Sequence, residues 1–277
     1  AEIAGISRKA IQMYEEGMST MVDIALDMEE FLGVSLILPV NPFKFNSEIH
    51  QLAQYVQPIQ ENESEILNHL ESIAQRIQTD FEARNEARDE ALRRSRELIR
   101  LCATAIRASH RDEWNTAREL LTQAEAIAYS IRDTVSPYPD ILHAGYTQDA
   151  LKELVEAHAT LALASGTPIP EPESLGVVYS TYLNGLCEAA SEMRRRCLDE
   201  LRRGSTVEAE RLLEAMDEIY DMLVTFDFPD AITGGLRRRV DQLRGVLERT
   251  RGDLTNSLRQ DRLVRALSEF EERVGNE

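Results

Sequence analysis

Apolar residues recur at helical spacing along most of the chain after residue 64. In the stretch 92–106, leucine and isoleucine fall mainly on one side of a helix drawn at about 100° per residue, and arginine falls on the other. Two proline-containing stretches, SPYPD at 136–140 and SGTPIPEPES at 165–174, interrupt this pattern, and Gly204 marks a further stop. We therefore expect helices over residues 64–109, 113–134, 146–164, 174–203, 205–226 and 230–272.

The composition agrees with a mainly helical protein. The 277 residues include only 13 glycines and 9 prolines, the residues least compatible with a helix interior. No apolar run approaches the roughly 18 residues that a membrane-spanning helix needs, and no signal-peptide pattern opens the chain. We predict an all-α, soluble, cytoplasmic protein without a membrane partner. Three well-separated cysteines without CxxC spacing indicate buried, reduced thiols: Cys102, Cys187 and Cys197.

The first 63 residues differ from the rest. Residues 1–33 carry short helical patterns that glycine interrupts three times, which outlines a helix-turn-helix, although many helical corners share that outline. Residues 34–62 hold three prolines with asparagine and glutamine and no long helical periodicity. We predict a partial helix-turn-helix segment over 1–45, a linker over 46–63 and a helical domain over 64–277.

The stretch ISRKAIQMYEEG resembles the turn and recognition helix of the lambda-repressor/Cro-like family. The matching positions are Ser7, Ile11, Glu15 and Gly17. The resemblance implies that three side chains near the start of the recognition helix face the major groove of DNA, namely Arg8, Lys9 and Gln12. That family's first helix would precede Ala1, so the DNA-binding unit in this sequence is a partial one.

A basic stripe contrasts with the formal net charge of −18. Between Arg84 and Arg111 there are eight arginines and four acidic residues, so this segment is locally +4. Five of the arginines fall within an arc of roughly 60°, namely Arg93, Arg96, Arg100, Arg107 and Arg111. A solvated helix face is one interpretation, and a phosphate-binding surface is the other, because guanidinium groups bind phosphate in bidentate geometry. His110 either joins this stripe or lies exposed at the helix end.

Two pairs of carboxylates mark the later helices. Glu153 and Glu156, in KELVEAHA, project within about 60° of one another, and Glu188 and Glu192, in CEAASE, lie four residues apart and project in the same direction. Like charges at these spacings repel, and in the first pair's helix only Lys152 offsets them. If the two helices face each other, the four carboxylates form a site for a hard divalent cation. Surface glutamates at these spacings are also common in helical proteins, so solvated acids remain the alternative.

Three further segments, in the same order along the chain, resemble motifs of the translin family (translin/TRAX-like, archaeal type) over residues 65–272. They are FEARNEARDEALRRSRELIRLCATAIRASHR (81–111), GYTQDALKELVEAHA (145–159) and YLNGLCEAASEMRRRCLDELRRGS (182–205). The stretch 223–254 is similar to the family's final helix and its lead-in. The resemblance implies a helical bundle that binds single-stranded RNA or DNA. It also implies a homo-oligomer resembling an octameric shell, or a hetero-oligomer with a paralogue.

In the TRAX branch the resemblance further implies a Mg²⁺-dependent endoribonuclease, with Mn²⁺ as a possible substitute. Carried over by motif, the metal-binding and catalytic residues are Glu153, Glu156, Glu188 and Glu192. Two positions depart from the family pattern: Leu154 replaces an aromatic residue, and Glu188 replaces an aspartate that is one methylene shorter.

Three functions follow from these features. The favoured hypothesis is a metal-dependent protein that binds and cleaves RNA, in which the basic stripe holds phosphates. The second is a translin-like binder of single strands without cleavage. The third is a transcription regulator that uses the N-terminal segment to read DNA. Three consecutive arginines are further phosphate-binding candidates, or simply an exposed basic turn: Arg194, Arg195 and Arg196.

Overall fold

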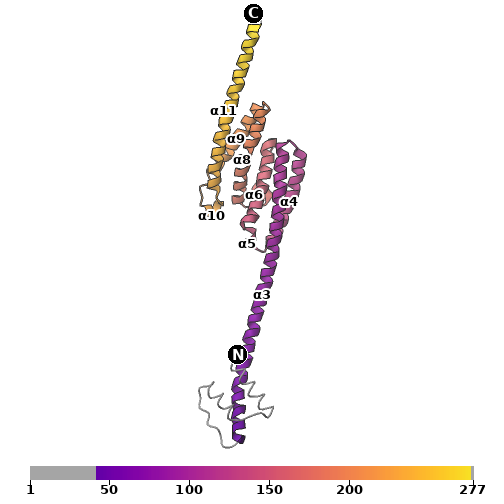
Figure 1. The fold of residues 1–277 in the computed structure, drawn as a ribbon, viewed down its shortest axis with the longest axis vertical. Helices are drawn as coiled ribbons and strands as arrows, with labels where there is room; N and C mark the ends of the chain where they lie inside the picture. Colours follow the sequence, from indigo (N-terminus) through magenta and orange to yellow (C-terminus); the bar gives the residue numbers. More distant parts are fainter. Residues whose placement is uncertain (1–41, 276–277) are drawn as a thin grey trace. The chain divides into compact units, whose positions relative to one another are not determined.

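The computed structural model describes the backbone of residues 42–275 and the side chains of residues 67–271. Over this part of the chain every regular element is a helix, as the sequence predicts (Figure 1). The long helices are α3 (Pro42–His110), α4 (Trp114–Val135), α6 (Gly145–Ser165), α8 (Tyr179–Arg202), α9 (Thr206–Leu223) and α11 (Leu236–Gly275). The short helices are α5 (Pro139–Leu142), α7 (Pro172–Leu175) and α10 (Asp230–Thr233).

The chain divides into two compact units, residues 1–82 and 83–277. In the second unit α8 packs against α6, α9 and α11, and α4 packs against α6. The end of α3 joins the same core through Leu98 and Cys102. Complete burial of one leucine or methionine stabilises the fold by roughly 1.5–3 kcal/mol, and α8 and α9 each contribute such a residue, Met193 and Met216. All three cysteines are buried and free, as predicted.

Glycine sets two helix boundaries that the periodicity does not reveal. The stretch predicted as one helix over 174–203 is divided into α7 and α8 because Gly176 adopts a left-handed φ of 62°. The stretch predicted over 230–272 is divided into α10 and α11 by two left-handed residues, Gly234 and Gly235. Gly204, predicted as a stop, has φ 77° between α8 and α9.

The predicted linker over 46–63 is helical, although the stretch 34–62 shows no long helical periodicity, because these residues form part of α3. Their glutamine, glutamate, leucine and isoleucine content favours a helix, and the one internal proline, Pro58, does not prevent it. The predicted DNA-reading residues Arg8, Lys9 and Gln12 lie outside the described residues, so the segment 1–45 stays a prediction.

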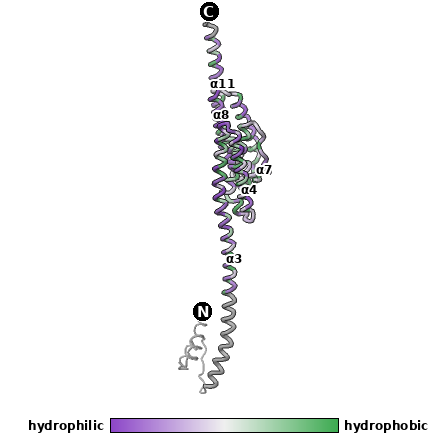
Figure 2. The backbone as a smooth tube through the Cα atoms, turned by 90° about the vertical axis from the view of Figure 1, so that its right-hand side faces the viewer, coloured by the Kyte–Doolittle hydropathy of each residue, from purple (hydrophilic) through white to green (hydrophobic). Residues whose placement is uncertain are grey.

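Hydrophobic and hydrophilic positions are interspersed along the whole of α11 (Figure 2). Among the described residues, no helix combines the length and the apolar character needed to cross a membrane.

Candidate metal centre

The backbones of α6 and α8 approach each other closely at Gly185. A Cβ atom at this position would lie 2.6 Å from Val155 Cβ and 2.9 Å from the carbonyl oxygen of Lys152. Only glycine fits such a contact, which explains the Leu-x-Gly sequence in α8. Because Glu188 lies about one turn beyond Gly185, this contact places the acidic face of α8 against the acidic face of α6.

The structure brings three of the four predicted carboxylates together. One oxygen from each of Glu153, Glu156 and Glu188 lies within 4.8 Å of the others, and all three residues are half-buried. We call this group the carboxylate cluster. It combines Glu153 and Glu156 of α6 with Glu188 of α8. Both members of the first predicted pair therefore belong to the cluster, whereas only one member of the second pair does.

The fourth predicted carboxylate, Glu192, lies beside the cluster and binds a histidine instead. Its Oε1 atom is 2.7 Å from Nε2 of His110 at the end of α3. His110 is buried, so it neither lies exposed at the helix end nor joins the basic stripe. Its other ring nitrogen, Nδ1, has no hydrogen-bond partner among the described residues. Glu192 is therefore held at the edge of the cluster by α3.

Two cations occupy one side of the cluster. The Lys152 ammonium lies 2.8 Å and 2.7 Å from the two oxygens of Glu188, and 3.7 Å from Glu153. Nε of Arg239, from α11, donates to Glu188 at 2.9 Å. Helical periodicity does not predict that Arg239 lies at this site, and it gives Lys152 only as a positive charge that offsets the two glutamates of its own helix. One feature of the sequence does single out Lys152: it is one of only three lysines in the chain.

The three carboxyl groups of the cluster have different pKa values. Burial, and then the neighbouring carboxylates on both helices, raise the pKa of Glu156 to about 8. Burial also raises the pKa of Glu153, although the charge of Lys152 opposes that change. Burial acts to raise the pKa of Glu188 as well, but the hydrogen bonds from Lys152 and Arg239 outweigh it, and the pKa is lowered.

These residues fit a hard divalent cation. The donor set consists of oxygen atoms only, which Mg²⁺ and Mn²⁺ prefer. Glu156 has no hydrogen bond or ion pair within the part of the chain whose side chains are described, so its carboxylate is the one that a cation would satisfy. The thiol of Cys102 is buried nearby, and burial and then the charges of Glu153 and Glu156 raise its pKa to about 12. At neutral pH that thiol is protonated and is not a ligand.

We expect Glu156→Gln to stabilise the metal-free protein at alkaline pH. Because the folded-state pKa of Glu156 is raised to about 8, the unfolded chain loses this proton first as pH rises above about 4.5. The wild type therefore loses stability progressively between about pH 5 and pH 8, and the glutamine variant lacks this loss. The variant should exceed the wild type by on the order of 2 kcal/mol at pH 8.5, after allowance for solvent screening. Urea unfolding in EDTA at pH 5 and 8.5 measures the difference, and equal gains at both pH values would contradict this prediction.

A methyl group at Gly185 should separate the two acidic faces. We expect Gly185→Ala to lower the free energy of unfolding by about 2 kcal/mol, although alanine favours a helix by about 1 kcal/mol. Gly252→Ala is the matched control, because no atom lies within 4 Å of a Cβ there and α11 is helical on both sides. Urea unfolding should show that the control is slightly stabilised. A stabilised Gly185→Ala variant would mean that the helices do not touch at this residue.

The basic stripe on α3 is partly neutralised. Arg93 forms ion pairs with Glu90 at 2.7 Å and Glu97 at 3.8 Å, and Arg111 forms one with Glu113 at 2.8 Å. Acids on the same or a neighbouring turn therefore pair with two of the five arginines of the stripe. Among the described residues, three of the predicted arginines are exposed and make no ion pair: Arg96, Arg100 and Arg107.

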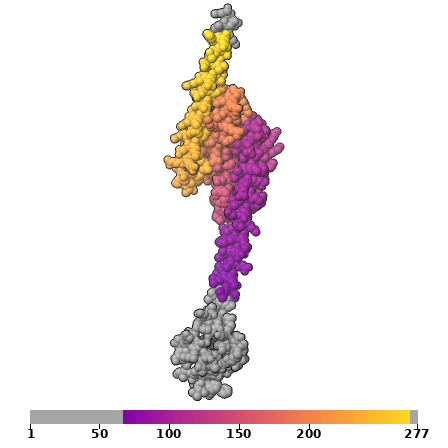
Figure 3. All heavy atoms as spheres, viewed as in Figure 1, coloured from indigo at the N-terminus to yellow at the C-terminus, as the bar shows by residue number. Residues whose placement is uncertain are grey.

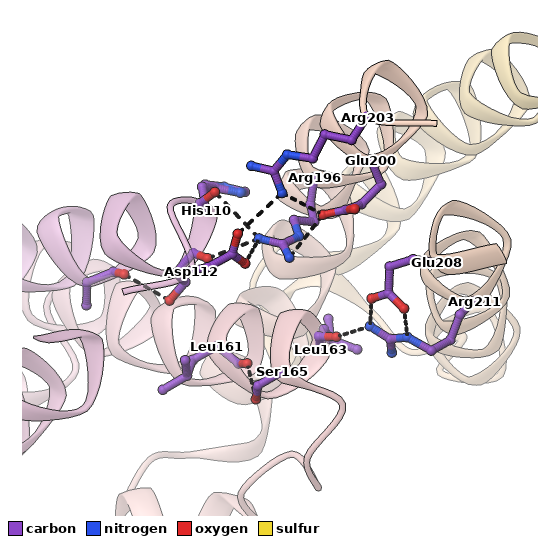
Figure 4. A network of polar contacts seen from close by, with 12 residues as sticks. His110, Asp112, Leu161, Leu163, Ser165, Arg196, Glu200, Arg203, Glu208 and Arg211 are labelled. Carbon is purple, nitrogen blue, oxygen red and sulfur yellow. Dashed lines mark hydrogen bonds and ion pairs between the residues drawn. The ribbon is translucent and has the colours of Figure 1, made fainter. Parts of the chain in front are cut away.

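The three consecutive arginines of α8 have different surroundings. Arg196 is buried, with ion pairs to Asp112 at 2.7 Å and Glu200 at 3.0 Å, so it is not available to a ligand (Figure 4). Arg194 pairs with Asp253 at 2.8 Å, whereas Arg195 is exposed. Arg196 instead fixes the corner after α3, where it also contacts the carbonyl oxygen of His110.

No family model matches the sequence. Among solved structures, the chain is similar to AfC3PO, a translin-family protein whose structure is known in complex with duplex RNA, with 32% identity and a TM-score of 0.62. The similarity covers 66% of this chain and 95% of AfC3PO. The chain belongs to the translin family. This translin-family chain is also 28% identical over 183 residues to an uncharacterised protein, MJ0175, of Methanocaldococcus jannaschii, which covers 65% of this chain and 80% of that protein.

A shorter similarity concerns a transcription regulator. Over 78 residues, the translin-family chain is 32% identical to the putative HTH-type transcriptional regulatory protein PF1851 of Pyrococcus furiosus. This match covers 28% of the chain and only 24% of the regulator. It is compatible with the predicted partial helix-turn-helix, but it is too short to carry over the regulator's activity.

Proposed function

We propose that this protein binds RNA and cleaves it with the help of Mg²⁺ held by the carboxylate cluster. The observation that carries the proposal is the convergence of Glu153, Glu156 and Glu188 to within 4.8 Å, in a chain 32% identical to a protein whose structure is known in complex with duplex RNA. Single-stranded RNA or DNA, expected from the family resemblance, is the further class of ligand to test. The absence of cleavage would leave a translin-like binder.

Each residue of the site has a distinct part in this proposal. Glu153, Glu156 and Glu188 would hold Mg²⁺ or Mn²⁺, which supplies charge neutralisation at a phosphate and lowers the pKa of a bound water. Glu192, whose Oε1 atom binds His110, keeps its second oxygen available to orient a water molecule. Lys152 and Arg239 hold Glu188 in place before RNA arrives, and they limit the negative charge that a phosphate would meet.

The unpaired arginines of α3 supply the phosphate contacts. Arg96, Arg100 and Arg107 project from one face and make no ion pair within the described residues. They retain the free guanidinium edges that phosphate oxygens require. Arg93 and Arg111, which already pair with glutamates, contribute less to binding.

Fluorescence anisotropy with labelled RNA tests the binding. We expect the double variant Arg96→Gln/Arg100→Gln to weaken the affinity for duplex and single-stranded RNA by about tenfold at 0.15 M salt and to reduce the salt dependence of binding. Arg93→Gln is the matched control on the same helix face, and its effect should be smaller because Glu90 neutralises that side chain. Equal affinities for the double variant and the wild type would place the RNA-binding surface elsewhere, and the absence of any RNA binding would overturn the proposed function.

A further inference from the structure

A row of four charged side chains runs along one side of α8, with one residue on each successive turn: Glu188, Glu192, Arg196 and Glu200. The first belongs to the carboxylate cluster. The next two contact the corner between α3 and α4, through His110 and Asp112. Figure 3 shows this end of the bundle, where the purple atoms of α3 and α4 lie against the orange atoms of α8 and α9. The row therefore connects the candidate metal centre to the end of the helix that carries the unpaired arginines.

Arg196 fixes this corner. Helix α3 ends at His110, and Asp112 then adopts a left-handed φ of 61°, which is uncommon for a residue other than glycine. Nη1 of Arg196 donates to the carbonyl oxygens of Ser109 at 3.3 Å and His110 at 3.5 Å, and it pairs with Asp112 at 2.7 Å (Figure 4). The carbonyl groups at the end of a helix lack partners within that helix. Arg196 supplies them, and so holds the main chain of His110 against α8.

The imidazole of His110 extends from this corner to Glu192. Nε2 of His110 lies 2.7 Å from Oε1 of Glu192, and the side chains are 2% and 31% exposed. A carboxylate only accepts hydrogen bonds, so Nε2 carries the proton in this contact. The other ring nitrogen is buried without a partner among the described residues. An apolar side chain would avoid that cost, so packing alone does not explain a histidine here, whereas its donor to Glu192 does.

Glu192 needs such a donor to stay beside the cluster. Glu188, four residues earlier on the same helix, carries a like charge that repels it. The charge of Glu192 also acts on Glu156, whose pKa it helps to raise, so these two carboxyl groups are close as well. About a third of the Glu192 side chain is exposed, and a long flexible side chain can turn outward to water. The hydrogen bond from His110 opposes that movement.

We propose, on the basis of the function proposed above, that His110 is a positioning residue whose Nε2–H group holds Glu192 beside the carboxylate cluster, with Arg196 holding His110 in place. Glu192 then orients the water molecule that attacks a phosphate of RNA. His110 touches neither the metal nor the RNA, and it acts on the reaction only through Glu192. A displacement of about 1 Å in a group that orients a reactant costs about 100-fold in rate.

Crystal structures of variants test this hold without any reaction. In His110→Leu we expect Glu192 to turn away from the cluster toward solvent. In His110→Gln it should keep its place, because the amide nitrogen of glutamine can donate from nearly the position of Nε2. His110→Asn is the matched variant, since its amide nitrogen lies nearer the main chain and cannot reach Glu192. It also provides the test if the leucine variant does not fold. A Glu192 side chain that keeps its position in His110→Leu or His110→Asn would overturn the proposal.

Cleavage kinetics test the consequence for the reaction. Single-turnover cleavage of RNA in Mg²⁺ should slow by about 30- to 100-fold in His110→Leu and by less than about fivefold in His110→Gln. The dissociation constant for RNA should change by less than about twofold in both, because no arginine of α3 is altered. His158→Leu is the control, since it removes another buried histidine with a glutamate partner, Glu125 at 3.1 Å, and it should leave the rate nearly unchanged. Equal losses in His110→Leu and His110→Gln would mean that the fit of the ring matters and its donor does not, which would overturn the proposal.

A double variant shows whether the two residues act together. In a Glu192→Gln background, His110→Leu should slow cleavage by less than about twofold further, because no carboxylate remains to be positioned. Losses that multiply would mean that His110 acts by another route, contrary to the proposal. A wild type that binds RNA without cleaving it would refute the proposed function, and the crystal structures would still decide whether His110 holds Glu192.

Discussion

Glu156→Gln should reduce Mg²⁺-dependent RNA cleavage by at least about 100-fold while RNA binding is retained. Glutamine keeps the size of the side chain but cannot ionise, so it cannot offer a cation the anionic oxygen of the one cluster carboxyl group that has no partner among the described residues. The expected loss lies in the chemical step, since the unpaired arginines of α3 are unchanged. Gel electrophoresis of end-labelled RNA in Mg²⁺ or EDTA measures cleavage, and anisotropy on the same samples measures binding.

Asp149→Asn is the matched control for this experiment. Asp149 is an exposed acid on α6, about one turn before Glu153, and it is not part of the carboxylate cluster. Its substitution should leave the cleavage rate nearly unchanged. Cleavage that persists in EDTA, or that survives in the Glu156→Gln variant, would show that the cluster does not carry the reaction. RNA retention without products in the wild type would leave the non-catalytic binder.

Lys152→Met should raise the affinity for Mn²⁺ by roughly 10- to 100-fold, or about 1.4–2.8 kcal/mol. The ammonium of Lys152 contacts both oxygens of Glu188 and approaches Glu153, so it lies between two of the carboxylates that a divalent cation needs. A cation that enters the cluster must displace it. Methionine keeps most of the aliphatic volume and removes the competing charge. Isothermal titration with Mn²⁺ at pH 7.5 measures the affinity.

Arg239→Met tests whether the gain in Mn²⁺ affinity comes from removing the ammonium that the metal must displace or only from removing one positive charge near the cluster. Arg239 also contacts Glu188, at 2.9 Å, but its other contacts are with Asn184 and Gly234 and not with Glu153. We expect its removal to raise the Mn²⁺ affinity less than the removal of Lys152 does. Equal increases would indicate a general electrostatic effect. A lower affinity in Lys152→Met would identify Lys152 as a support that positions Glu188 for the metal.

The directions of Glu153 and Glu156 follow from helical periodicity alone, but the partners of Glu188 and Glu192 do not. Both of the latter project the same way from α8, yet Glu188 meets Lys152 and Glu192 meets His110. The partners of this pair come from α6, α11 and α3, and the periodicity of one helix carries no information about which helices lie beside it. The fold class was predictable because each amphipathic pattern is local to its own helix.

Two features that the sequence did not predict have a common physical origin. The helix over 46–63 was missed because Pro58, and the prolines that precede this stretch, are strong local signals, while the helix formers around them act collectively. The neutralisation of Arg93 was missed because a face drawn at 100° per residue hides acids that reach across from the adjacent turn. In both cases the combined effect of several neighbouring residues decides the local structure or charge, and a single conspicuous residue, a proline or an arginine, does not.

The contact at Gly185 has a consequence for how this protein tolerates sequence change. Where two helices are separated by side chains, larger or smaller residues can shift them gradually. Here main chain lies almost directly on main chain, since a single carbon added to Gly185 would fall 2.9 Å from the carbonyl oxygen of Lys152. The distance between the acids of the two helices is therefore a property of the peptide backbone. Variation in the surrounding apolar residues can accumulate without altering that distance, whereas one methyl group at the crossing point changes it at once.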